Sequence, residues 1–178
     1  MAAQLDPKLS FIFNRRSIRA YRPGAVSEET VQTLLEAAMA EPSAAGKDPW
    51  RFVVTRQREV LGQIAAALPN GRMIADAAVG ITVCGDLNAA HACQLSYLLQ
   101  DCSAAIENLL LAARALGLGA CWLGVHPRED RVRRLSEILG LPAHIIPVSA
   151  IALGWPGEEK PARTRFNAGY VHLEQFRA

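Results

Sequence analysis

Hydrophobic positions follow a helical period in some stretches of the chain and run unbroken in others. Val31, Leu34, Leu35 and Ala38 fall on one face of a helix, and Ser27 is placed to cap its first turn. Short apolar runs of strand length separate such stretches. The pattern predicts helices over 9–13, 27–40, 59–68, 95–116 and 127–140, and strands over 51–55, 78–84, 120–125 and 145–153, the last interrupted by Pro147.

Prolines and glycines mark the ends of these segments. Pro42 follows the 27–40 helix, and Gly117 and Gly119 follow the 95–116 helix. Pro127 suits the first helical position of the next helix, which ends near Gly140. Residues 15–23 are expected to form a basic connector.

The longest predicted helix, 95–116, is apolar almost all round. Asp101, Glu107, Asn108 and Arg114 interrupt it. A helix of this kind lies at the centre of a fold or in an interface between subunits. We therefore expect a homodimer, because a chain of 178 residues has little surface of its own left to cover such a helix.

The order of elements predicts an α/β (α+β) sandwich, in which helices flank one mixed sheet of four or five strands. The 178 residues form a single domain, with 51% apolar and 20% charged residues. This composition excludes a disordered chain. The net charge of +2 is too small for a nucleic-acid-binding domain.

Four cysteines, at 84, 93, 102 and 121, show no C-x-x-C spacing. They indicate a reducing, cytoplasmic compartment and are expected to be small buried thiols. A metal site with His91 is the alternative, but no metal is predicted. The N-terminus has no apolar signal segment, and residues 138–157 hold three prolines and three glycines, so no membrane span is expected.

Two basic clusters are the main candidates for chemistry. The first, 15–19, places three arginines and Ser17 within five residues, and the second contains Lys160, Arg163 and Arg165. Arginine binds phosphate oxygens through two parallel hydrogen bonds, so the first cluster suits a phosphate ester. A solvated basic turn and a solvated tail are the alternative interpretations.

Two further segments complete the pattern. Residues 41–50 form a loop bracketed by prolines, and residues 116–124 place glycines on both sides of a strand. Such glycines permit close approach of a flat ligand to the backbone, although a plain buried strand gives the same pattern. The chain has no G-x-S-x-G, H-E-x-x-H or phosphate-binding P-loop motif, and its G-L-G lies before a strand, which excludes a dinucleotide fold.

In this order, R-R-S-I-R, P-S…P-W, L-G-L-G-A-C-W-L-G and G-W-P…K-P-A-R-T-R resemble the flavin-dependent nitroreductase family over residues 11–171. The resemblance implies an intertwined homodimer with one FMN at each of two interfacial sites. It also implies that NADH or NADPH reduces the flavin at N5, which then reduces a small nitroaromatic, quinone or similar conjugated acceptor by a ping-pong mechanism. No side chain is expected to act as a catalytic group.

The resemblance assigns roles to individual positions. Arg15, Arg16 and Ser17 correspond to phosphate and ribityl ligands, and Arg19 to a cation near N1 and O2 of the ring. Arg163 and Arg165 match a phosphate-binding pair. The remaining cofactor-binding positions implied are Pro42, Ser43 and Ala44 from the other subunit, and Asn70, Trp122, Leu123, Gly124 and Lys160.

The chain departs from the family in the proline-bracketed loop. Gly46 and Asp48 stand where the family often has Asn and Gln before Pro-Trp. These departures keep open a non-catalytic flavin-binding or ligand-sensing module on the same fold. Ring-fragmenting or dehalogenating branches of the family need substrate-clamping segments that are not found in this sequence. The absence of a long lid insertion predicts an open pocket of broad specificity.

Overall fold

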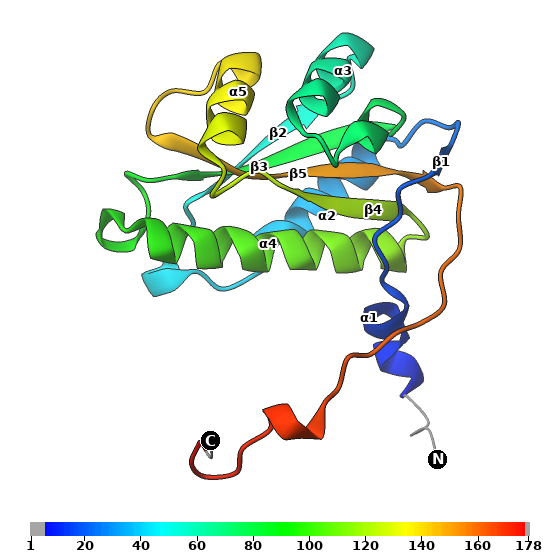
Figure 1. Cartoon of the computed structure of the whole chain (residues 1–178), viewed down its shortest axis with the longest axis vertical. Helices are drawn as coiled ribbons and strands as arrows, with labels where there is room; N and C mark the ends of the chain where they lie inside the picture. Colours follow the sequence, from blue (N-terminus) through cyan, green and yellow to red (C-terminus); the bar gives the residue numbers. More distant parts are fainter. Residues whose placement is uncertain (1–5, 177–178) are drawn as a thin grey trace.

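A central sheet lies between two layers of helices in the computed structural model, which describes residues 6–176 (Figure 1). Within these residues the sheet has five strands: β1 (Tyr21–Arg22), β2 (Trp50–Thr55), β3 (Val79–Asp86), β4 (Gly119–Gly124) and β5 (Ile145–Pro156). The strands run in the order β2-β3-β5, and both β4 and β1 pair with β5. All these pairs are antiparallel, whereas Ser17 forms an isolated parallel bridge with Ala120. The predicted α+β sandwich with a mixed sheet is confirmed.

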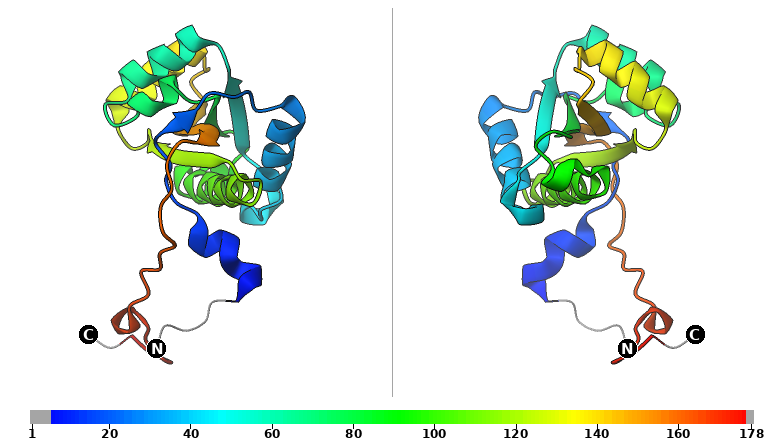
Figure 2. Two further views of the ribbon diagram at one scale, coloured as in Figure 1. Left: turned by 90° about the vertical axis from the view of Figure 1, so that its right-hand side faces the viewer. Right: turned by 90° about the vertical axis from the view of Figure 1, so that its left-hand side faces the viewer.

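Helices cover both faces of the sheet. Helices α2 (Glu28–Met39) and α4 (Leu95–Ala115) lie on one face, and α3 (Arg58–Ala67) and α5 (Glu129–Leu139) lie on the other (Figures 1 and 2). Because side chains alternate along a strand, β5 supplies both cores. Ile151 and Leu153 belong to the cluster under α2 and α4, and Ala150 and Ala152 to the cluster under α3 and α5.

Local signals set several element ends as expected. The Ser27 side chain accepts a hydrogen bond from the Thr30 amide (3.1 Å) and caps α2. Gly140 adopts a left-handed conformation (φ 63°) and ends α5. The sheet register shifts between Val83 and Cys84, opposite Pro147 of β5, where the sequence predicts an interruption.

Three expectations are wrong in detail. Pro127 is not the first residue of α5, which begins at Glu129 with Arg128 as its N-cap. The 15–23 connector contains β1, which pairs with Trp155 and Pro156 and extends β5 beyond its predicted end. Cys93 is exposed, although the other three thiols are buried and all four are free. Burial raises the pKa of the Cys84 and Cys102 thiols to about 12.

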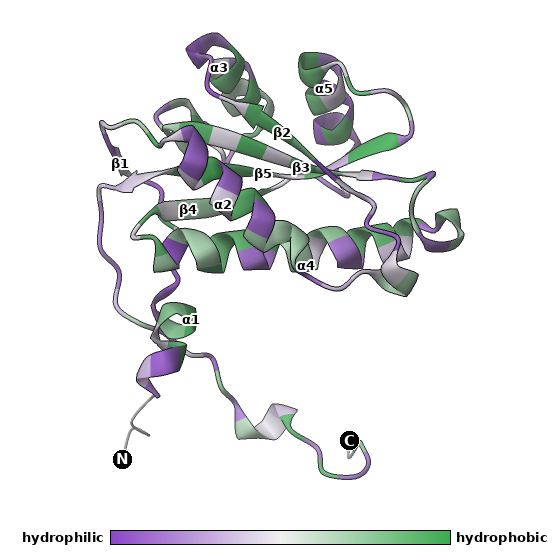
Figure 3. Cartoon of the chain, turned by 180° about the vertical axis from the view of Figure 1, so that it is seen from behind, coloured by the Kyte–Doolittle hydropathy of each residue, from purple (hydrophilic) through white to green (hydrophobic). Residues whose placement is uncertain are grey.

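Both ends of the chain leave the sheet on the same side. The 3₁₀ helix η1 (Pro7–Leu9), α1 (Ser10–Asn14) and the segment after β5 extend away from the body (Figures 1 and 2). Apolar and polar residues alternate along this C-terminal segment, which includes η5 (Ala168–Tyr170) (Figure 3). Phe166, Tyr170, Leu173 and Phe176 are 74–81% exposed.

Helix α4 is not buried on every side within one chain. Leu98, Cys102, Leu109 and their neighbours are buried in the core, but Gln100, Ala104 and Arg114 are exposed on its outer face. The remaining 3₁₀ turns are η2 (Ala44–Gly46), η3 (Arg72–Ala75) and η4 (His91–Cys93). Among residues 6–176, no helix is both long and apolar enough to cross a membrane.

Candidate functional site

The two basic clusters lie side by side in the fold. The chain after β5 returns along the segment that follows α1. The Gly157 amide donates to the Ala20 carbonyl (2.8 Å), and the Arg163 amide donates to the Phe13 carbonyl (3.1 Å). Ile18 is fixed in turn by a hydrogen bond from its amide to the Ala120 carbonyl of β4 (3.0 Å). These contacts place the basic segment 15–19 between β4 and the C-terminal segment.

A hollow of about 620 Å³ opens between these two segments, and we call it the basic hollow. Every predicted basic site residue of the sequence lines it, and no carboxylate of residues 6–176 does. Such a surface favours an anion of high charge density, because Arg and Lys offer charge-assisted hydrogen bonds. Its lining is Ile12, Phe13, Arg15, Arg16, Ser17, Arg19, Lys160, Arg163, Thr164 and Arg165.

Some of these cations hold the hollow together. Arg15 pairs with Glu107 of α4 (2.9 Å), and the Lys160 ammonium contacts both Glu158 (2.8 Å) and the Ser17 carbonyl (2.7 Å). The Arg16 guanidinium donates to the Pro161 carbonyl. Lys160 is therefore already engaged with protein groups.

Three guanidinium groups in the basic hollow remain free. Across residues 6–176, the side chains of Arg19, Arg163 and Arg165 form no hydrogen bond or ion pair. The Arg19 amide, by contrast, donates to Glu158 (2.6 Å), which fixes the backbone and leaves the side chain available. These free cations are the ones best placed to meet an anionic ligand.

A second hollow, of about 510 Å³, lies along the edge of β4, and we call it the edge hollow. It shares Arg19 with the basic hollow and contains the predicted residues Asn70, Trp122, Leu123 and Gly124. A side chain at Gly124 would meet no heavy atom within 4 Å, so the backbone there faces open space. A flat ligand can lie along this edge while its anionic end reaches the basic hollow.

Arg131 of α5 also lines the edge hollow, and sequence reasoning missed it. Its guanidinium donates to the Gly124 carbonyl (2.8 Å). The only sequence signal is the cluster of arginines at the start of α5, at the N-cap position 128 and at 131, 133 and 134. The path of the turn between β4 and α5 determines which of these arginines reaches the edge of the sheet.

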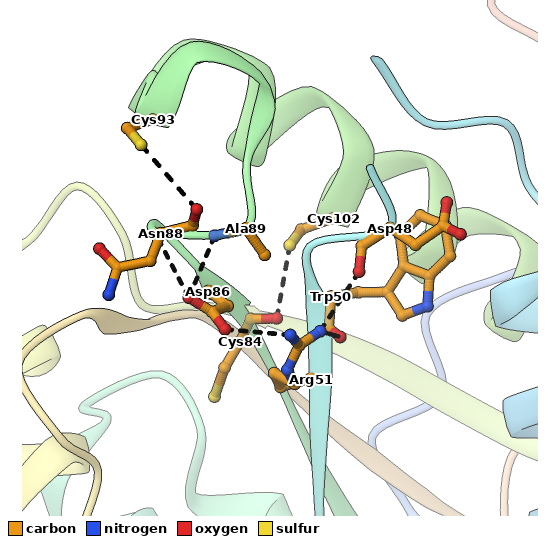
Figure 4. A network of polar contacts seen from close by, with 9 residues as sticks. All are labelled: Asp48, Trp50, Arg51, Cys84, Asp86, Asn88, Ala89, Cys93 and Cys102. Atoms are coloured by element: carbon orange, nitrogen blue, oxygen red, sulfur yellow. Dashed lines mark hydrogen bonds and ion pairs between the residues drawn. The ribbon is translucent and has the colours of Figure 1, made fainter. Parts of the chain in front are cut away.

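The proline-bracketed loop lies elsewhere in the same chain. Residues 42–44 line neither hollow. The Ser43 hydroxyl donates to the Asp48 carboxylate (2.6 Å) and accepts from the Asp48 amide (3.0 Å). Arg51 reaches the Asp48 carbonyl (3.2 Å) and the Asp86 carboxylate (3.0 Å), which ties the loop to β2 and β3 (Figure 4). Asp48 therefore rigidifies this loop from within.

Two buried carboxyl groups support the start of the loop. Glu41 is 7% exposed and Asp101 of α4 is 5% exposed. One Asp101 oxygen accepts a hydrogen bond from the Ala44 amide (2.9 Å), whereas its other oxygen and both Glu41 oxygens have no hydrogen-bond partner among residues 6–176. Burial, followed by the charges of Asp101 and Asp48, raises the pKa of Glu41 from 4.5 to about 7.

Known proteins of similar sequence and similar structure cover almost the whole chain. A protein of Archaeoglobus fulgidus named "Putative NADH dehydrogenase/NAD(P)H nitroreductase" is 44% identical over 175 residues, covering 97% of this chain and 100% of that protein. The crystal structure of a protein of the same name from Parabacteroides distasonis has a TM-score of 0.91 and 35% identity, over 97% of this chain and 100% of that one. A putative nitroreductase from Desulfovibrio desulfuricans, solved in complex with FMN, has a TM-score of 0.83 and 34% identity, over 98% and 100%.

The fold and the two hollows that share Arg19 define an α+β domain suited to a flat ligand with an anionic end. The family model described as the nitroreductase family matches residues 12–71 and 62–155. The chain belongs to the nitroreductase family.

Proposed function

We propose that the protein is an FMN-dependent oxidoreductase that uses NADH or NADPH to reduce nitroaromatic, quinone or similar conjugated acceptors. The observation that carries this proposal is that the two hollows share Arg19 in their linings. One hollow supplies cations for a phosphate, and the other supplies an open strand edge for a ring. The names of the relatives support both the cofactor and the reductant.

The basic hollow fits the phosphate of FMN because the described residues that line it include six cationic side chains and no carboxylate. In this proposal Arg163 and Arg165 bind the phosphate directly, since their guanidiniums have no protein partner among the described residues. Arg16 and Ser17 complete the phosphate and ribityl contacts. Arg15 and Lys160 also face the hollow, but their ion pairs give them a second role in holding the two segments together.

The edge hollow fits the ring. Arg19 lines both hollows, and its positive charge would favour negative charge on a reduced ring held there. Residues 122–124 supply the strand edge, and Asn70 supplies an amide. A flavin held by these residues would supply the hydride and electron transfer between NADH or NADPH and the acceptor. In this proposal the protein residues bind and orient the flavin and polarise its ring.

We also infer that the protein works as an intertwined homodimer. The large apolar residues of the C-terminal segment are highly exposed, and Leu95 and Tyr97 of α4 are more than a third exposed, which favours a partner that covers them. Pro42, Ser43 and Ala44 line neither hollow of their own chain, which suits a role against the ring bound by a partner. Light scattering should show a dimer, and a stable folded monomer at micromolar concentration would refute the inference.

The free thiols fit a reducing, cytoplasmic setting, which is part of the same proposal.

Anaerobic mixing of the FMN-loaded protein with NADH or NADPH tests the function. Rapid bleaching of the flavin absorbance, followed by its return when an acceptor is added, is expected. Parallel lines in double-reciprocal initial-rate plots would accompany it, because reductant and acceptor use one open face in turn. A flavin that binds but is not reduced would instead favour the non-catalytic binding or sensing module.

A further inference from the structure

The charge of the edge hollow is not balanced. Arg19 and Arg131 both line it, and no Asp or Glu does. Within the described part of the chain, neither guanidinium takes part in an ion pair. A partly enclosed hollow with one sign of charge attracts ligands of the opposite sign. The flavin proposed above accounts for Arg19, at the junction with the basic hollow, but leaves Arg131 without an anionic partner.

Arg131 is held in place by one end of its guanidinium. One terminal nitrogen, Nη1, donates to the Gly124 carbonyl (2.8 Å), whereas the other, Nη2, and Nε have no protein partner among residues 6–176. The side chain is half-buried, so its position is more restricted than that of a free surface arginine. A planar guanidinium with two free donor nitrogens matches the oxygens of a carboxylate or a phosphate.

The other charges of α5 do not compensate for Arg131 in this hollow: the carboxylates Asp130 and Glu137 are exposed and do not line it. Glu129 and Arg133 line a separate hollow, next to Leu95 and His126. Arg134 is exposed and lines neither the basic hollow nor the edge hollow. Arg131 is therefore the cation of α5 that reaches the strand edge.

We propose that Arg131 is a specificity-determining residue that binds an anionic group, a carboxylate or a phosphate, on the substrate that enters the edge hollow. This inference rests on the proposed function, because it places the substrate beside a ring bound along residues 122–124. The oxyanion has two possible sources: an acidic substituent on the electron acceptor, or a phosphate of the nicotinamide nucleotide. The binding chemistry of Arg131 is the same for both.

Three variants separate this role from a structural one. Arg131→Gln removes the charge but keeps a hydrogen-bond donor that can reach toward the Gly124 carbonyl. Arg131→Lys keeps the charge, and Arg134→Gln removes an exposed charge from the same helix as a matched control. The binding test titrates benzoate and neutral benzamide into the oxidised FMN-loaded protein and follows the flavin spectrum. The turnover test compares kcat/KM for para-nitrobenzoate and para-nitrobenzamide, and for NADPH and NADH.

The expected result is a loss of selectivity for anions. Arg131→Gln should lower the preference for benzoate over benzamide, and for para-nitrobenzoate over its amide, by roughly 5- to 50-fold, the effect of losing one charge-assisted contact. Arg131→Lys should retain most of the preference, and Arg134→Gln should change it less than twofold. If Arg131→Gln lowers only the ratio of kcat/KM for NADPH to that for NADH, the anion is the nucleotide phosphate, and this result also supports the proposal.

Two results would overturn it. One is that Arg131→Gln leaves all three preferences unchanged: benzoate over benzamide, para-nitrobenzoate over its amide, and NADPH relative to NADH. The other is an equal loss with charged and neutral partners that Arg131→Lys does not restore, because that pattern assigns Arg131 only to holding the Gly124 carbonyl. The proposed function fails separately, if NADH and NADPH do not bleach the flavin. The benzoate titration does not depend on turnover and still tests Arg131 in that case.

Discussion

Replacing Glu41 by glutamine should change the pH dependence of folding stability. The Glu41 carboxyl is buried next to Asp101, and within the described part of the chain neither of its oxygens has a hydrogen-bond partner. Its pKa is raised to about 7 in the folded protein, from an ordinary value of 4.5. The folded state therefore holds this proton more tightly than the unfolded state.

The sign of the effect follows from that difference. Below pH 4.5 both states are protonated at Glu41, and the group costs no stability. As the pH rises from 4.5 to 7, the unfolded chain releases the proton first, so the wild-type protein loses stability, and above about pH 7 the loss is constant. The full difference corresponds to roughly 2 to 3 kcal/mol, the lower figure allowing for solvent screening.

Urea unfolding at pH 5 and pH 8, at one protein concentration, measures this effect. Glu41→Gln cannot ionise, so its stability relative to wild type should rise between the two pH values by most of the ~2 to 3 kcal/mol. Glu137→Gln, at an exposed position of α5, is the control and should show no such rise. An equal stability difference between Glu41→Gln and wild type at both pH values would refute the reasoning.

Two other substitutions test the core and the ring site. Leu110→Asp places a charge at a position of α4 that is 4% exposed, and it should destabilise the protein by roughly 3 to 5 kcal/mol in thermal or urea unfolding; normal folding would show that the helix packs differently. Arg19→Ala should retain much of its FMN affinity but lower the flavin midpoint potential, because the charge near the ring is lost; an unchanged potential would remove Arg19 from the ring site.

The sequence predicts most elements to within one or two residues because their signals are local. The Ser27 cap, the Gly140 stop and the apolar runs of β3 and β4 each depend on a few neighbouring residues. Strand β1 has only two residues and forms through pairing with Trp155 and Pro156, so no local pattern announces it.

The residues of the candidate site also fall into two groups: those that local sequence patterns identify, and those whose role depends on the fold. Charge and residue type identify the two basic clusters, but only the path of the C-terminal segment beside residues 13–20 brings them into one hollow. Arg131 was missed because nothing local distinguishes it from the other arginines of α5. Its role depends on the turn that places it against the Gly124 carbonyl. The buried pair of Glu41 and Asp101 joins residues sixty positions apart and is equally invisible in local patterns.

Titration of FMN and of riboflavin into the apoprotein tests the central claim most directly, since the two ligands differ only in the phosphate. If the two basic clusters form a phosphate site, the wild-type protein should bind FMN at least ~100-fold more tightly than riboflavin. Arg165→Ala should weaken FMN binding roughly 10- to 150-fold, leave riboflavin binding unchanged and stay folded. Equal affinities of the wild-type protein for FMN and riboflavin would contradict the account.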